Sequence, residues 1–207
     1  MKKILSALAL AAVAVGAHAE LTYTGGTLTS INNYNPTGTT SPQTQGLIDP
    51  VLSAPFAGLL SATFLGFEAL DNDVYGFALA SGSLNNQTSA VGTTITGPIP
   101  SGNLVFTFTD TFTNESVGNG GNANASVYSS YVILGTSNGG VFSPYHGPVG
   151  QFYDFVLGFN DGLKVDADYD DMVVGLRLNP VPEPETYALM LAGLGAIGFI
   201  GRRRRKS

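Results

Sequence analysis

Five aspartates lie within eleven residues in the stretch DGLKVDADYDD, which holds a single lysine. They are Asp161, Asp166, Asp168, Asp170 and Asp171. Carboxylates so close together repel each other unless solvent, a base or a cation offsets their charge. Hard divalent cations such as Ca²⁺ take about six to eight oxygen ligands, which an aspartate-rich loop provides. The stretch is therefore either a calcium site or a solvated acidic loop without an ion.

The spacing of these aspartates does not match the calcium loop of an EF-hand. Counting from Asp166, the glycine position holds Asp171, and the position of the bidentate glutamate holds Arg177. A second acidic segment, LGFEALDNDVYGF, contains Glu68, Asp71 and Asp73. This segment either shares a cation with the first or forms a simple acidic turn.

The alternation of the sequence indicates where the aspartates lie. Asp166, Asp168 and Asp170 have the same parity as the apolar residues Met172 and Val174. Because side chains two residues apart share one face of a strand, a continuous strand would point these carboxylates into the core. We therefore expect the chain to curl before Met172, so that the acids gather at one end of a sheet.

Residues suited to catalysis are scarce. The sequence has no cysteine, and its two histidines are His18 and His146. Only His146 lies outside the N-terminal segment, and no nucleophile motif surrounds it. We expect a protein that is not an enzyme. Because pairs of carboxylates cleave glycosides, a carboxylate-based glycoside hydrolase or lyase is the alternative.

The distribution of charge excludes nucleic acid as a partner. The section from Glu20 to Pro182 contains thirteen acidic residues and only two basic ones, Lys164 and Arg177. Its net charge is therefore −11. Neutralising phosphates requires clustered Lys and Arg side chains.

The N-terminal segment, MKKILSALALAAVAVGAHAE, predicts a secretory signal peptide. Two lysines precede an apolar run, and the small residues Ala17 and Ala19 form an A-x-A cleavage pattern. We expect a signal peptidase to cut after Ala19 and the remainder to be exported. Without cysteines the exported domain depends on its core, or on bound metal, for stability.

The C-terminal segment combines three features. Pro182 and Pro184 favour extended backbone, and an uncharged stretch of 16 residues runs from Thr186 to Gly201. A basic cluster follows, at Arg202, Arg203, Arg204, Arg205 and Lys206. The stretch is shorter than the usual membrane span of about 20 residues. Flanking side chains that reach the membrane surface offset this shortfall in length. The uncharged stretch predicts a single transmembrane helix. By the positive-inside rule, the basic cluster after it stays on the cytoplasmic side and acts as a stop-transfer signal.

This order of a Val-Pro-Glu-Pro-Glu motif, an apolar helix and an arginine cluster resembles the PEP-CTERM sorting signal, also labelled the ice-binding-protein C-terminal domain. The resemblance implies that Pro182, Glu183 and Pro184 are recognised by an exosortase, a membrane transpeptidase that removes the tail. It implies an exported protein of the cell surface, or of the exopolysaccharide or biofilm matrix, in a Gram-negative bacterium. The aspartate-rich stretch also resembles segments found just before this tail, in some of which calcium binding is suspected. A permanently membrane-anchored surface protein is the alternative.

Between these segments, short apolar runs alternate with Gly, Asn, Ser and Thr, which is typical of strands and turns. Strands are expected at residues 21–29, 62–67, 74–80, 103–110, 127–134, 152–159 and 172–178. Longer loops are expected at residues 32–46 and 114–126. We expect a signal peptide at 1–19, an antiparallel β-sandwich or jelly-roll-like domain at 20–180 and the sorting signal at 181–207.

Overall fold

A computed structural model of the chain describes residues 20–38, 43–68, 71–121, 129–161, 168–181 and 184–205. These residues form sixteen strands and one helix. The predicted signal peptide at 1–19 lies outside them, as do Pro182, Glu183 and Lys206.

The largest sheet contains nine antiparallel strands. Its order is β2-β4-β13-β15-β16-β6-β3, with β14 paired to β13 and β9 paired to β6. The bounds are β2 (Thr27–Ser30), β3 (Thr37–Gly38), β4 (Gln45–Ile48), β6 (Gly58–Phe67), β9 (Thr94–Ile99), β13 (Ser129–Asn138), β14 (Val141–Pro144), β15 (Phe155–Asp161) and β16 (Met172–Pro180).

Two smaller antiparallel sheets complete the domain. The four-stranded sheet has the order β12-β11-β7-β8, and the three-stranded sheet has the order β1-β5-β10. Their bounds are β7 (Asp73–Phe77), β8 (Leu84–Asn85), β11 (Phe106–Asp110), β12 (Glu115–Gly118), β1 (Thr22–Thr24), β5 (Val51–Ala54) and β10 (Gly102–Asn103).

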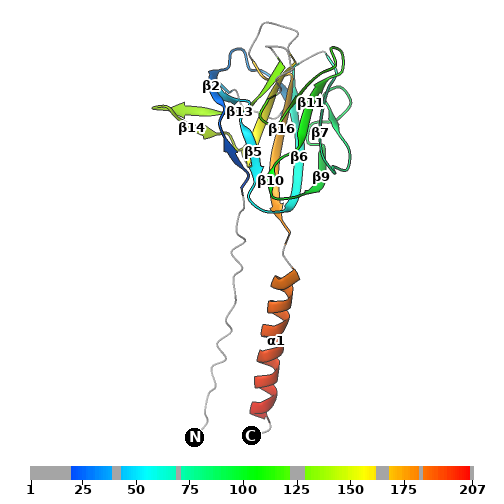
Figure 1. Cartoon of the computed structure of the whole chain (residues 1–207), viewed down its shortest axis with the longest axis vertical. Helices are drawn as coiled ribbons and strands as arrows, with labels where there is room; N and C mark the ends of the chain where they lie inside the picture. The colour runs from blue at the N-terminus through cyan, green and yellow to red at the C-terminus, as the bar shows by residue number, and fades with distance from the viewer. Residues whose placement is uncertain are drawn as a thin grey trace.

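Both smaller sheets pack on one face of the large sheet. Phe108 of β11 stacks on Phe159 of β15 with ring centroids 5.0 Å apart. Tyr23 of β1 meets Phe155 edge-on at 5.6 Å. These contacts belong to one hydrophobic core between the layers. Figure 1 shows the strands of the sandwich in ribbon form. The prediction of a mainly β, antiparallel fold is confirmed, and the packing is that of a β-sandwich.

The outer face of the large sheet is buried as well. In β16, Met172 and Val174 enter the main core, whereas Val173 joins a second cluster with Tyr169 and Val156. All seven residues of β15 are buried. The predicted alternation therefore correctly assigns the two faces, but both of them pack against apolar groups because loops cover the outer face.

Several sequence predictions differ from the structure in detail. The expected strand at 21–29 is interrupted at Gly25 and Gly26, whose φ angles are +70° and +86°. The expected loops contain β3, the start of β4 and β12; residues 39–42 and 122–128 lie outside the described part. These short strands pair through backbone groups, so their polar composition gave no signal.

The helix α1 spans Pro184–Arg205 and extends away from the sandwich beyond the end of β16 (Figure 1). Its described apolar side chains, including Met190, Leu194 and Ile197, are exposed. No helix in the described part of the chain is long and apolar enough to cross a membrane. The prediction of a transmembrane helix is therefore not confirmed.

One end of the sandwich collects the acids. Strands β6, β11 and β15 end there, and β7, β12 and β16 begin there. Since β16 runs from this end to the end that bears α1, the acidic end lies on the side of the domain opposite the tail (Figure 1).

Candidate functional site

Three carboxylates meet where β6 ends and β16 begins. Glu68, Asp168 and Asp170, here called the outer group, each place one carboxylate oxygen within 4.8 Å of the others. Glu68 is exposed, whereas Asp168 and Asp170 are 7% and 0% exposed. The outer group joins one acid of the second acidic segment to two of the predicted calcium ligands.

The local backbone explains this meeting. The N–H of Glu68 donates to the carbonyl of Asp170 at 2.8 Å, which extends the β6–β16 pairing past the last paired strand residues. Tyr169 has a φ of +56°, which breaks the extended backbone. Its side chain is buried in the second cluster and bonds Ser130 at 3.2 Å. The predicted curl before Met172 is present.

Asp170 is held in a way that leaves one oxygen without a hydrogen-bond donor. The N–H of Asn35 donates to Oδ2, while the buried Oδ1 accepts no hydrogen bond within the described part of the chain. Burial raises the pKa of Asp170, and the neighbouring Glu68 carboxylate raises it further. A buried acceptor beside two further carboxylates fits a hard cation, which would supply the missing positive charge.

The other described aspartates of the predicted site lie in a second group. The N–H of Asp161 donates to Oδ2 of Asp171 at 2.8 Å. Both lie close enough to Asp73 to interact electrostatically with it, and we call Asp73, Asp161 and Asp171 the inner group. Burial, reinforced by the neighbouring carboxylates, raises the pKa of Asp73 and of Asp171 to about 8. The predicted aspartates are thus divided between two groups, and Asp166 lies outside the described residues.

Asn86 is a residue of this region that the sequence analysis missed. It is buried, its Oδ1 accepts from the N–H of Asp73 at 2.9 Å, and its Nδ2 lies 2.9 Å from Oδ2 of Asp73. The same Nδ2 is within hydrogen-bond distance of the carbonyls of Asp71 and Asp171, at 2.9 and 3.3 Å. Asn86 therefore connects β7 to the start of β16, and nothing in its local sequence indicated this role.

Two further buried aspartates accept hydrogen bonds from backbone N–H groups. Asp110 accepts the N–H groups of Phe112 and Thr113 at 2.7 and 3.1 Å, which closes the turn after β11. At the opposite end of the sandwich, Oδ2 of Asp154 accepts the N–H groups of Leu21 and Leu178 at 3.3 and 2.7 Å. Asp154 thereby ties the first strand to the last.

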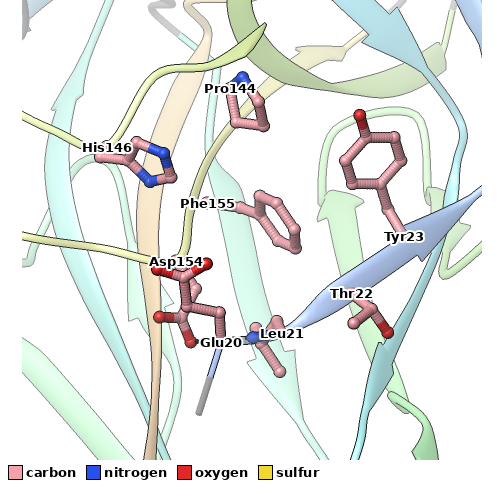
Figure 2. A pocket seen from close by; sticks show the side chains of 8 residues that line it. All are labelled: Glu20, Leu21, Thr22, Tyr23, Pro144, His146, Asp154 and Phe155. Atoms are coloured by element: carbon pink, nitrogen blue, oxygen red, sulfur yellow. Dashed lines mark hydrogen bonds between the residues drawn. The ribbon is translucent and has the colours of Figure 1, made fainter. Parts of the chain in front are cut away.

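A shallow pocket of about 350 Å³ lies beside Asp154. Figure 2 shows the rings of Tyr23 and Phe155 along it, with His146 and Asp154 on the other side. Nδ1 of His146 is 2.9 Å from the carbonyl of Tyr153, and the imidazole stacks on Phe152. The polar groups of this pocket are therefore largely engaged with the protein itself.

The tail carries the second functional feature. Residues 180–205 match a family model described as the PEP-CTERM protein-sorting motif. Comparison with curated proteins and with solved structures gave no match for the chain. Pro184 begins α1, and Arg202, Arg203, Arg204 and Arg205 occupy its last turn. The chain therefore carries a PEP-CTERM protein-sorting motif at residues 180–205, which implies an exported, cell-surface-directed protein that an exosortase processes.

Proposed function

We propose that this protein is a surface or exopolysaccharide-matrix component of a Gram-negative bacterium, whose β-sandwich has a structural or binding role and is stabilised by calcium. The sorting motif supports the destination. The outer group, in which Oδ1 of Asp170 is buried and has no hydrogen-bond partner among the described residues, supports the cation.

The proposed route of maturation uses both ends of the chain. Signal peptidase cuts after Ala19, the basic cluster holds the precursor at the membrane, and exosortase recognises the Pro-Glu-Pro motif. The exposed apolar side chains of α1 support this route, because those that the structure describes are not buried against the sandwich. Mass spectrometry of exported protein tests it: material that begins at Glu20 and lacks the arginine cluster is expected. Exported protein with an intact tail would instead indicate permanent anchoring.

Glu68, Asp168 and Asp170 are the proposed ligands of the cation. Each offers a carboxylate oxygen, and water is expected to complete the coordination because Glu68 is exposed. Bound calcium would join the end of β6 to the start of β16.

A thermal-unfolding experiment tests the calcium role. Calcium is expected to raise the melting temperature of the wild-type chain, and the chelator EDTA to remove the increase. Glu68→Gln keeps the size of the side chain but removes a charged ligand, so its calcium response is expected to shrink. Glu20→Gln, an exposed acid at the opposite end, serves as the control and should respond like the wild type. A wild-type melting temperature that is insensitive to calcium and EDTA would overturn the calcium role.

The proposed role is not catalytic. In the pocket of Figure 2, Asp154 is buried and bonds two backbone N–H groups, which leaves little of it for a substrate. Incubation with the host exopolysaccharide is expected to release no reducing ends. Release that Asp→Asn substitutions abolish would establish the glycoside-active alternative instead.

A further inference from the structure

The first strand of the sandwich is held at its start by one buried carboxylate. Leu21, the residue before β1, is 3% exposed and belongs to the main core. Its N–H donates to Oδ2 of Asp154 at 3.3 Å, and the same oxygen accepts the N–H of Leu178 at 2.7 Å. Asp154 is itself 1% exposed. Glu20 therefore enters the domain directly beside a buried acid.

The strand β1 is otherwise weakly attached. It contains three residues, lies at the edge of the three-stranded sheet and pairs with β5. The ring of Tyr23 adds edge-on contacts with Phe142 and Phe155. Because so short an edge strand has few backbone hydrogen bonds, its attachment depends strongly on the contact between Leu21 and Asp154.

The predicted cut after Ala19 changes the charge at this point. Hydrolysis of the bond between Ala19 and Glu20 leaves a carboxylate on Ala19, and it turns the neutral amide nitrogen of Glu20 into an ammonium group that is mostly protonated at neutral pH. Successive backbone nitrogens are at most about 3.7 Å apart, so the nitrogen of Glu20 lies within roughly 7 Å of Oδ2 of Asp154. Both residues line the pocket of Figure 2, which shows them side by side.

The groups around this nitrogen favour a positive charge. Asp154 and the exposed side chain of Glu20 are both acidic, and His146 lines the same pocket with its Nδ1 directed at the carbonyl of Tyr153. Backbone N–H groups bring only partial charges to Asp154. A full positive charge nearby stabilises a buried carboxylate further, because the protein interior screens charges less than water does.

We propose that the ammonium group freed at Glu20 forms an ion pair with Asp154, so that removal of the signal peptide fastens the first strand of the sandwich to the last. This inference rests on the proposed cleavage after Ala19 and does not depend on calcium. The precursor, in which the same nitrogen is an uncharged amide, is the less stable form. The domain therefore reaches its full stability only after the chain has been exported and cut.

Thermal unfolding of two purified chains tests the ion pair. One chain begins at Glu20 and ends at Ser207, and the other carries a short glycine extension before Glu20, which moves the ammonium group away from Asp154. The chain that begins at Glu20 is expected to melt about 2–4 °C higher. Asp154→Asn, made in both chains, should remove this difference.

Asp110→Asn is the matched control. Asp110 is also buried and also accepts two backbone N–H groups, but at the acidic end, so this substitution should leave the difference between the two chains unchanged. Equal melting temperatures of the two wild-type chains, or a difference that persists in Asp154→Asn, would overturn the ion pair alone. Exported protein that begins elsewhere than at Glu20 would overturn both the proposed maturation route and this inference.

A second measurement covers a failure of Asp154→Asn to fold. The rate at which the N-terminal amine reacts with an acylating reagent near neutral pH is followed by mass spectrometry of the N-terminal peptide. An ion pair favours the protonated, unreactive form, so the folded chain that begins at Glu20 should react several-fold more slowly than the extended chain. The two rates should become equal in urea. Equal rates in the folded chains would overturn the ion pair.

Discussion

The two ends of the sandwich place buried aspartates in different surroundings. At the tail end, Oδ2 of Asp154 accepts two backbone N–H groups from the first and last strands. At the acidic end, burial raises the pKa of Asp73 and of Asp170, and neighbouring carboxylates raise both further. A charge bound by backbone donors stabilises the fold by itself, whereas a cluster of like charges is tolerated only when protons or a counter-ion offset its charge.

The ends also differ in how their function is encoded. The tail is a sorting motif made of consecutive residues, which implies processing by an exosortase. The acidic end is assembled from segments that are far apart in the chain and that the fold brings together. Substitutions should therefore act on processing at one end and on cation-dependent stability at the other.

The largest effect is expected in the tail. Replacing Pro182, Glu183 and Pro184 together by alanine should abolish removal of the tail, because these residues are the proposed recognition element, while the sandwich unfolds at an unchanged temperature. Mass spectrometry of the exported protein measures the first effect and thermal unfolding the second. Normal processing of this variant would show that recognition lies elsewhere in residues 180–205.

A smaller but still large effect is expected at Asp154. Asp154→Ala leaves two backbone N–H groups without their acceptor, which costs about 2–4 kcal/mol of unfolding free energy. Asp154→Asn retains a side-chain oxygen as acceptor and should cost less than half as much. Urea unfolding measures both. Equal losses in the two variants would mean that the charge of Asp154, rather than its hydrogen bonds, holds the strands.

At the acidic end, the stability of the calcium-free protein should depend on pH. The pKa of Asp73 is raised to about 8 in the folded protein, above about 3.9 in an unfolded chain. The folded state therefore binds more protons between these values, so the unfolding free energy falls as the pH rises from about 4 to about 8. A fall of about 2 kcal/mol in EDTA is expected, allowing for solvent relaxation around the group. A flat profile in EDTA would contradict the raised pKa of Asp73.

The smallest effect has the opposite sign to that at Asp154. Asp73→Asn in EDTA at pH 8.5 should stabilise the chain by about 1 kcal/mol, because it removes one of several buried like charges while an amide remains to face Asn86. Urea unfolding in EDTA measures this change, and destabilisation would show that the charged Asp73 stabilises the fold.

Much of the fold followed from residue patterns. The alternation around Phe106 and Phe108, and that around Met172 and Val174, correctly predicted the core-facing sides, because burial on one side imposes a period of two. Short polar strands such as β12 were not predicted, since backbone pairing rather than side-chain burial forms them. The expected curl before Met172 was correct because three acids at core parity could not enter an apolar layer.

The candidate site was predicted only in part. The five aspartates, and the second acidic segment with Glu68 and Asp73, stood out in the sequence as clusters of like charge. Their division into outer and inner groups depended on strand pairing: β16 lies beside β6 in one sheet, and β7 lies in the facing sheet. The role of Asn86 had no sequence signal, because an amide gains it only through its position.

The sequence by itself thus determined the sorting motif, the negative charge of the domain and the alternation that predicts strands. Each of these depends only on composition or on residues close together in the chain. The tertiary structure decided which carboxylates become neighbours and which of them face backbone donors. That outcome depends on contacts between residues far apart in the chain, and only the order and register of the strands specify them.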